Sequence, residues 1–477
     1  MSVDELRQRV KSLMPQARED LARMVALKSV YDPRSSPDED CQRMVDLTIE
    51  LFSGAGLQDV QAHETSDGSM SVCGHAPGPP GSPTVLLYFH HDVQPPLDER
   101  AWASPVWELT DRHGRWYGRG AADCKGNIVT HLTALRALGD ELPVGVKIVG
   151  EGSEELGDGG LEEFVPGHAD LLRADVILIC DSGNSAAGTP TLTSALRGVV
   201  EVVVTVRTLT SAMHSGMFGG AAPDALVALI QMLASLHDAG GNTTIRGLDN
   251  SQVWSGAKYP PDEFREHAHV KPGVDLLGDD VADMVWARPS LSVLGIDCPA
   301  VGGASAVIQP EARALISLRV PPGSDAKTAQ QALVAHLKSV TPWHAEVEFE
   351  SGFSGQPFVG TVQGPAFDAM SAAMRDVYGR DVTLQGSGGS IPLCNVFQET
   401  FPNAEIMLLG VEEPTCLIHA PNESVNPTEI ENMAIARRCF SNDARGRRRL
   451  SRAQLAVRRD VTAPVDTRPT AHASRAR

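Results

Sequence analysis

Residues 83–96 read PTVLLYFHHDVQPP, an apolar run that ends abruptly in two histidines, an aspartate and two prolines. An apolar run without alternation is typical of a strand that is covered on both faces of a sheet. In an open α/β sheet, such strands present polar groups at their carboxyl ends, where ligands bind. The stretch therefore predicts a strand that delivers a functional site, with an ordinary polar loop as the alternative.

Two other short runs are also apolar without alternation, and a predicted helix lies between PTVLLYF and the first of them. VGVKIVG (144–150) and ADVILIC (174–180) also lack alternation, and NIVTHLTALRAL (127–138) carries apolar residues at helical spacing. Strands that alternate with helices in this way predict an α/β domain with a largely parallel sheet.

The pattern of apolar and polar residues changes at Arg197. GVVEVVVTVRT (198–208) alternates like a half-exposed strand, and the segments up to about Phe353 predict antiparallel strands with helices. The predicted organisation is therefore an α/β domain in two parts, with a smaller α+β domain inserted between them. The predicted boundaries are 1–196 and 356–440 for the α/β domain, 197–355 for the inserted domain and 441–477 for a C-terminal tail.

The composition describes an acidic globular protein. Of the 477 residues, 42% are hydrophobic and 21% are charged, and the net charge is −19. An acidic body repels nucleic acid and membrane surfaces, and no apolar stretch reaches the roughly 18 residues that a membrane span needs. Eight cysteines without a CxxC pair indicate a reducing cytoplasm rather than a disulfide framework or a thiolate zinc site.

The C-terminal tail differs from this body. Twelve arginines and three aspartates give residues 437–477 a charge of +9, so the remainder carries −28. The tail lacks apolar periodicity, and we expect it to be disordered. Its abrupt change of composition indicates a reading-frame change late in the gene.

Five further strand ends or turns carry imidazole or carboxylate groups, which are ligands for divalent metals. Each block alone could be a solvated polar loop, but their recurrence after apolar runs or at glycine-rich turns favours a shared site. The blocks are GRGAADCKGN (118–127), GEGSEELGDGG (150–160), ICDSGN (179–184), MHSGMFGG (213–220) and IHAPNESV (418–425).

With these blocks, the sequence resembles the M20-type di-zinc aminopeptidase-like metallopeptidases. This family includes carnosinase-type dipeptidases, acetylornithine deacetylase and succinyl-diaminopimelate desuccinylase. The resemblance runs from about residue 10 to 435 and rests on FHHDVQPP, YGRGAADCKG, EGSEELG, HSGMFGG, SLRVPPG, GSGGSIP and HAPNESV in consistent order. It implies that the α/β domain is catalytic and that the inserted domain is a lid through which a homodimer forms.

The resemblance also implies a centre with two divalent metal ions, zinc in the first place, with manganese or cobalt as alternatives. The implied ligands of one ion are His90 and Asp181, those of the other are Glu155 and His419, and Asp123 bridges both. Imidazole and carboxylate donors without thiolate suit these metals. A carboxylate with two oxygens can span ions about 3.5–4 Å apart.

Two acidic residues beside these ligands receive roles from the same resemblance. Asp92 shares a strand face with His90 and orients its imidazole, whereas His91 points to the opposite face. Glu154 is the implied general base, which activates a metal-bridging water and later passes the proton to the leaving amine. The peptide bond after the bridging Asp123 is expected to be cis.

Substrate-binding groups are implied at four positions. Arg319 of SLRVPPG resembles a carboxylate anchor, because a guanidinium grips a carboxylate with two parallel hydrogen bonds; a surface strand arginine is the alternative. Gly389 and Ser390 of GSGGSIP are expected to line the same pocket. His214, in the lid, is implied to reach the neighbouring subunit's site and stabilise the oxyanion. The alternatives are that it caps a glycine turn or acts within its own chain.

Two positions depart from the family pattern, and both bear on substrate preference. Cys124 stands where aspartate or asparagine is usual, and Ala306 stands where carnosinase-like members carry a polar residue.

We therefore predict a cytoplasmic, metal-dependent enzyme that hydrolyses dipeptides or small peptides with a free carboxylate, without a nucleic-acid or membrane partner. An N-acyl amino acid amidohydrolase with the same machinery is the alternative. A catalytically dead scaffold is disfavoured because the whole ligand set is present. A nucleic-acid-binding protein that uses the tail is disfavoured by the acidic body and by a tail without interleaved aromatic residues.

Overall fold

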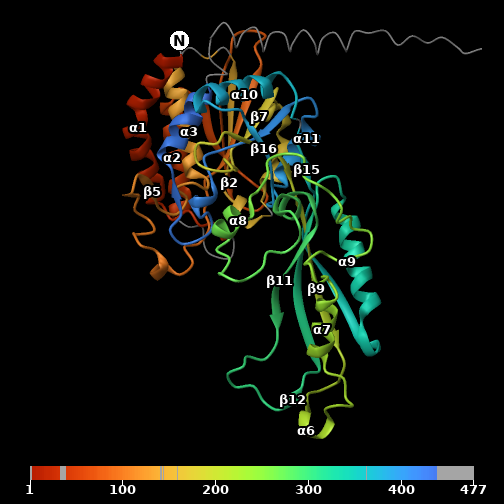
Figure 1. The fold of residues 1–477 in the computed structure, drawn as a ribbon. Coiled ribbons are helices and arrows are strands. Elements are labelled where there is room, and N and C mark those ends of the chain that lie inside the picture. Colours follow the sequence, from red (N-terminus) through yellow and green to blue (C-terminus); the bar gives the residue numbers. More distant parts are fainter. Residues whose placement is uncertain are drawn as a thin grey trace, which may run out of the picture.

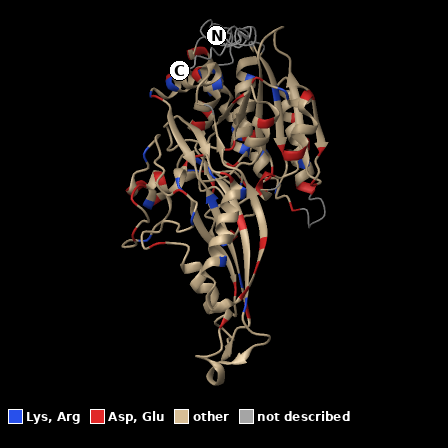
Figure 2. Ribbon diagram, turned by 90° about the vertical axis from the view of Figure 1, so that its right-hand side faces the viewer, with Lys and Arg blue, Asp and Glu red and all other residues tan. Residues whose placement is uncertain are grey.

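The computed structural model of the chain describes residues 3–32, 39–139, 142, 144–157, 159–360 and 362–437, and the tail predicted at 441–477 lies outside them. The described chain forms a layered αβ body and a long, narrow antiparallel sheet that extends from it (Figure 1). Figure 2 shows acidic and basic residues interspersed along both parts. No helix among the described residues is both long and apolar enough to cross a membrane.

The body is built around a mixed nine-stranded sheet whose middle strands are parallel. β3 (Thr84–His90) pairs in parallel with β6 (Gly145–Glu151) and with β7 (Val176–Ile179), and β17 (Glu405–Leu408) pairs in parallel with β7. The sheet is completed by β1 (Gln58–Glu64), β2 (Met70–Ala76), β8 (Thr191–Leu196), β15 (Phe358–Val359) and β16 (Thr383–Ser387). The apolar runs of the sequence thus form the predicted central strands.

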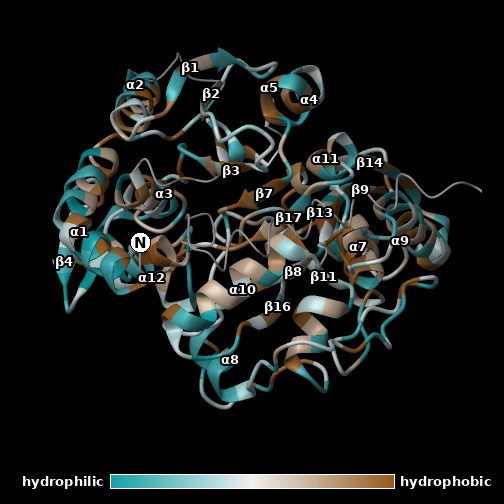
Figure 3. Ribbon diagram, turned by 90° about the horizontal axis from the view of Figure 1, so that it is seen from above, coloured by the Kyte–Doolittle hydropathy of each residue, from teal (hydrophilic) through white to brown (hydrophobic). Residues whose placement is uncertain are grey.

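Helices cover both faces of this sheet, because its central strands carry apolar side chains on both sides. Val85, Leu87 and Phe89 of β3 pack on one side, and Leu86 and Tyr88 pack on the other. The first side is covered by α1 (Val3–Val25), α2 (Glu39–Gly54), α3 (Lys125–Leu138), α10 (Pro365–Tyr378) and α12 (Pro427–Ala436). The second side is covered by α4 (Leu161–Gly167), α5 (Ala169–Leu172) and α11 (Leu393–Thr400). Seen from above, the hydrophobic strand β7 lies in the middle of these layers (Figure 3).

The narrow sheet has four antiparallel strands in the order β11-β13-β9-β14. Its strands are β9 (Gly198–Arg207), β11 (Ser290–Asp297), β13 (Glu311–Val320) and β14 (Glu346–Gly355). Alternate residues of β9 (Val200, Val202, Val204 and Val206) pack in one cluster with α7 (Ala225–Ala234) and α9 (Ala326–Val340), which is the predicted period of two.

Shorter elements complete the two parts. At the tip of the narrow sheet, β10 (Met213–His214) pairs with β12 (Val307–Ile308), and α6 (Ser215–Phe218) follows β10 directly (Figure 1). α8 (Pro261–His267) belongs to the long connection between α7 and β11. A small sheet joins β4 (Thr110–Arg112), β5 (Arg115–Tyr117) and β18 (Ser424–Val425) beside the body.

The predicted fold class is confirmed: a mixed α/β body carries a separate antiparallel sheet. The chain leaves the large sheet between β8 and β9 and returns to it between β14 and β15. The domain boundaries at 196/197 and 355/356 fall at these crossings and stay a prediction.

Candidate metal centre

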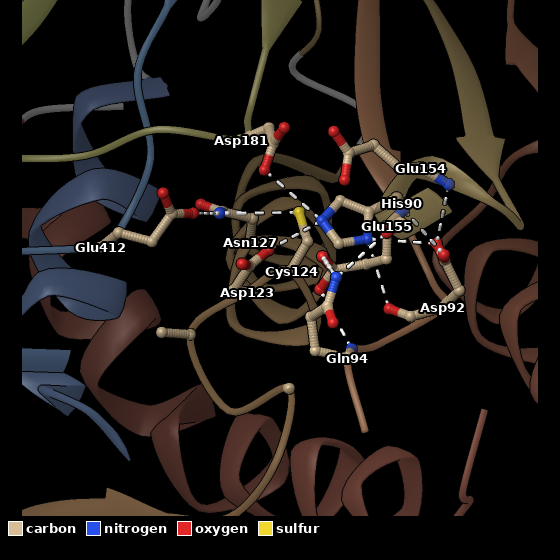
Figure 4. A network of polar contacts seen from close by, with 12 residues as sticks. His90, Asp92, Gln94, Asp123, Cys124, Asn127, Glu154, Glu155, Asp181 and Glu412 are labelled. Atoms are coloured by element: carbon tan, nitrogen blue, oxygen red, sulfur yellow. Dashed lines mark hydrogen bonds and ion pairs between the residues drawn. The ribbon is translucent and has the colours of Figure 1, made fainter. Parts of the chain in front are cut away.

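The five predicted metal ligands converge at the carboxyl edge of the parallel strands, and Figure 4 shows four of them, His90, Asp123, Glu155 and Asp181. His90 ends β3, Glu155 lies in the short turn after β6, and Asp181 follows β7 by two residues. Asp123 lies just before α3, and His419 lies in the loop after β17. Parallel strands end at a common edge, which explains how positions distant in the sequence meet here.

Asp123 lies between two pairs of side chains. Its Oδ1 is 2.8 Å from His90 Nε2, and that nitrogen is 3.4 Å from Asp181 Oδ1. Its Oδ2 is 3.0 Å from His419 Nε2, which in turn is 3.0 Å from Glu155 Oε2. Burial alone would raise the pKa of Asp123, but hydrogen bonds with His419 and His90 lower it. The two oxygens of Asp123 therefore face the two ligand pairs that the resemblance assigns to two different ions.

The residues after His90 hold these ligands in place. Asp92 Oδ1 lies 3.3 Å from His90 Nδ1, and the Asp92 carboxylate accepts the backbone N–H groups of Glu154 and Glu155 at 3.3 and 3.0 Å. Gln94 Nε2 donates to Glu155 Oε2 at 2.9 Å. Asp92 thus makes the contact with the imidazole that was predicted for it, and it also anchors the acidic turn.

A buried ion pair fixes the loop that carries Asp123. Arg119 Nη1 donates to Glu423 Oε2 at 2.7 Å, and both side chains are only 1% exposed. Glu423 also accepts the backbone N–H groups of Gly120, Ala122 and Asp123 at 2.9, 3.0 and 3.1 Å. One carboxylate therefore holds both the arginine and the backbone that presents the bridging position.

Replacing Arg119 with methionine is expected to lower the free energy of unfolding by about 3–5 kcal/mol, because it leaves the Glu423 carboxylate buried without its counter-ion. Urea denaturation of the variant and the parent protein measures the difference. Arg100→Met is the matched control, because Arg100 pairs with Asp98 on the surface and should cost less than about 0.5 kcal/mol. Equal losses in the two variants would contradict the role of the buried pair.

The predicted base Glu154 faces the same centre and lines the adjoining cleft. Burial raises the pKa of Glu154 well above its usual range, and the charge of Asp181 adds to this. Burial likewise raises the pKa of Glu155 to about 6, with a further contribution from Asp123. Carboxylates held this close repel one another unless cations lie among them. Two imidazoles and three carboxylates that point at one another therefore fit divalent metal ions.

A cleft of about 1060 Å³ adjoins the centre. Gly389 and Ser390, which were expected to share a substrate pocket with Arg319, line it together with Asp123 and Glu154. Strand β16 and the segment around α8 form its other walls, so the narrow domain contributes to the cleft through the connection between α7 and β11.

Two predicted substrate groups are not among the residues that line the cleft in the described chain. Arg319 is partly buried in β13, opposite Val199 of β9, and is not among the residues that line the cleft. Burial, followed by the charge of Arg319, lowers the pKa of Arg197 to about 10, so the two guanidinium groups lie close enough to repel each other. His214 is exposed at the tip of the narrow sheet, where its Nδ1 accepts the N–H of Gly216 at 3.1 Å. In the structure, His214 therefore caps its glycine turn, which was one of the alternatives.

His91 and Cys124 are both sequence neighbours of predicted ligands, but only Cys124 lies beside the ligand cluster. His91 is buried outside the ligand cluster, as the strand period predicted, and burial lowers its pKa to about 4. Cys124 follows Asp123 through a cis peptide bond, as the resemblance implied. Its Sγ lies within 4.8 Å of donor atoms of His90 and Asp181, and it donates to the carbonyl of Cys180 at 2.8 Å. Burial raises the pKa of this thiol.

Glu412 and Gln94 belong to the centre, but the sequence analysis did not identify them. Glu412 follows strand β17, and one of its oxygens lies within 4.8 Å of oxygens of Asp123 and Asp181. Burial raises the pKa of Glu412 well above its usual range, and Asp123 and Asp181 add to this. The rule that pointed to His90, a polar side chain after a buried strand, would have found both residues.

A mixed αβ sheet with imidazoles and carboxylates gathered at its carboxyl edge is the architecture of a metal-dependent hydrolase. Residues 86–441 match the model of the peptidase family M20/M25/M40. The chain belongs to this family.

Relatives of the chain narrow the class further. It is 41% identical over 437 residues to the cysteinylglycine-S-conjugate dipeptidase of Corynebacterium striatum. The aligned region covers 89% of this chain and 95% of that protein. It is 27% identical to the β-Ala-His dipeptidase of Rattus norvegicus, over 87% of this chain and 85% of the relative. The crystal structure of human carnosine dipeptidase 1 has the same fold, with a TM-score of 0.78 at 23% identity over 95% of this chain and 99% of that one.

These similarities confirm the prediction of a metal-dependent dipeptidase of the M20 family that acts on small peptides. They do not test which residue has which role, and the assignments of ligands, base and substrate-binding groups stay predictions.

Proposed function

We propose that this enzyme hydrolyses dipeptides of the cysteinylglycine type, including those that carry a substituent on the cysteine sulfur. The support comes from the 41% identity to a cysteinylglycine-S-conjugate dipeptidase along nearly the whole of that protein. The observation that carries the catalytic assignment is the position of Asp123, whose two oxygens face two separate histidine–carboxylate pairs. The alternative activity, hydrolysis of N-acyl amino acids, is not among the activities that name the relatives described above.

We propose two metal ions, zinc in the first place. His90 and Asp181 would hold one ion, Glu155 and His419 the other, and Asp123 both. Such ions supply Lewis acidity to the scissile carbonyl and acidify water at neutral pH. Asp92 fixes the ring of His90 by accepting from Nδ1, so that Nε2 faces the centre.

Glu154 acts as general base in this proposal. It takes the proton from the attacking water and returns it to the leaving amine, and its position in the cleft beside the ligands supports this role. Gly389 and Ser390, which line the cleft, border the bound peptide, and Arg319 is the proposed anchor of its carboxylate. The neighbouring guanidinium group of Arg197 supports a carboxylate partner for Arg319.

We further propose a homodimer that forms through the narrow domain. Large apolar side chains are exposed on α6, α7 and the edge strand β11, which is unusual for a surface that faces water. They are Met217, Phe218, Val227, Ile230, Val293, Leu294 and Ile296. A two-fold interface would cover the same patch on both subunits. The eight scattered cysteines support a cytoplasmic location.

Removal of the metal tests the proposed function. The chelated protein is expected to lose at least about 100-fold in activity on cysteinylglycine and an S-substituted cysteinylglycine, and zinc, manganese or cobalt should restore it. An N-acetyl amino acid serves as the comparison substrate. Preferential hydrolysis of that compound by the reconstituted protein would contradict the proposed dipeptidase specificity.

A further inference from the structure

Glu412 is a sixth carboxylate at the centre, beyond the three ligand carboxylates, the base and Asp92. It lies after β17 and lines the cleft, although the residue is only 8% exposed. In Figure 4 it approaches the ligands from the side opposite to Asp92. The proposed mechanism gives this carboxylate no task.

The side chain of Glu412 is held in a defined position. Its Oε1 accepts from Asn127 Nδ2 at 2.8 Å, and Asn127 Oδ1 accepts the N–H of Val411 at 3.0 Å. The carbonyl of Glu412 accepts the N–H of Asn184 at 2.7 Å. Among the described residues no hydrogen bond to Oε2 is found, so this oxygen is available to a ligand in the cleft. A buried carboxylate in such a position calls for a cationic partner.

The two proposed metal ions are balanced by other carboxylates, so a cationic partner for Glu412 has to come from outside the metal site. Asp123, Glu155, Asp181 and Glu154 carry four negative charges when ionised, and two divalent ions balance them. Asp92 is satisfied by the ring of His90 and by two backbone N–H groups. Within the described chain, Glu412 makes no ion pair with a lysine or arginine, so its side chain has no cationic partner there.

We infer that Glu412 binds the α-ammonium group of the dipeptide substrate, an inference that rests on the proposed dipeptidase function. In a dipeptide this nitrogen is separated from the scissile carbonyl carbon by one atom, a distance of about 2.5 Å. The group that recognises it must therefore stand beside the metal centre, as Glu412 does with an oxygen within 4.8 Å of oxygens of Asp123 and Asp181. Arg319, at the other end of the peptide, is predicted to take the carboxylate.

This contact gives the enzyme a way to reject N-acyl amino acids. Such compounds have the same scissile amide and the same carboxylate, but they lack the ammonium group. Their binding would bury Glu412 against an apolar group and leave its charge unpaired, a penalty that discriminates strongly between substrates. Glu412 thus determines specificity and does not take part in the chemical step.

Alanylglycine and propionylglycine test the inference, because they differ only in the amino group. The wild-type enzyme should prefer alanylglycine in kcat/KM by a factor on the order of 10². Glu412→Gln should reduce this preference to less than about 10-fold, mainly through a higher KM for alanylglycine. Glu412→Asp, which keeps the charge, should recover part of the preference. Glu263→Gln is the matched control, because Glu263 also lines the cleft but lies in α8, and it should leave the preference unchanged.

Metal analysis and thermal unfolding of the same variants separate the other roles of Glu412. Retention of both metals and of the parent melting temperature in Glu412→Gln is expected. Loss of metal from this variant would make Glu412 a ligand and overturn the inference, as would an equal fall in kcat/KM for both substrates. If the wild-type enzyme itself prefers propionylglycine, the dipeptidase proposal fails and takes the inference with it. If it prefers alanylglycine and Glu412→Gln keeps that preference, only the inference fails.

Discussion

Replacing Glu154 with glutamine is expected to reduce the turnover of a dipeptide by about 10²–10⁴-fold while both metal ions stay bound. Glutamine keeps the shape of the side chain but cannot take a proton from water. The metal site should survive, because Asp123 and Glu155, which face His90 and His419, are unchanged. Turnover is measured with saturating cysteinylglycine, and the metal content is measured on the same preparation.

Glu155→Gln is the informative comparison for this variant. The two residues are neighbours in one turn, but the Glu155 oxygen lies 3.0 Å from His419 Nε2, whereas Glu154 faces the cleft. Glu155→Gln should lose metal as well as activity, and Glu154→Gln should lose activity alone. Empty metal sites in Glu154→Gln, or turnover within tenfold of the wild type, would refute the assignment of Glu154 as base.

The residues that the resemblance implied as ligands lie together in the structure, and for two of them a local pattern explains why. His90 and Asp181 stand directly after buried strands, and the strand order brings all such ends to one edge. The pattern requires only an apolar run and the residues that follow it. Glu412 follows the buried strand β17 in the same way, so the local pattern also predicts a polar group at this edge of the sheet.

Other features depend on contacts between distant segments, which no local pattern carries. The pair of Arg119 and Glu423 joins positions that only the finished fold makes adjacent. Whether Arg319 lines the cleft likewise depends on how β13 of the narrow sheet is placed against the body, which no local pattern determines. For the same reason, the resemblance supplied a role for His214 but not its place in the structure.

His214 is expected to act in the active site of the neighbouring subunit, and its position and its hydrogen bond in the structure are consistent with that role. The residue lies at the tip of the narrow sheet, remote from the carboxyl edge of the large sheet within the same chain (Figure 1). Its Nδ1 accepts the N–H of Gly216, so in the neutral ring the proton is on Nε2. The turn cap therefore prepares an exposed hydrogen-bond donor, which is what a developing oxyanion requires. His214→Ala should lower turnover by about 10²–10³-fold.

Mixed dimers distinguish action between subunits from action within one chain. His214→Ala and Glu154→Ala are each expected to be nearly inactive on their own, and co-expression with two different tags allows the mixed dimer to be purified. If His214 acts across the interface, one site of the mixed dimer combines an intact Glu154 with the partner's intact histidine, while the other site carries both lesions. About half of the wild-type activity per dimer should then return. If His214 acts within its own chain, each site keeps one lesion and the mixed dimer stays inactive. If His214 only caps its turn, the His214→Ala protein should retain most of its activity, because the loss of one exposed cap alters stability and not the chemical step.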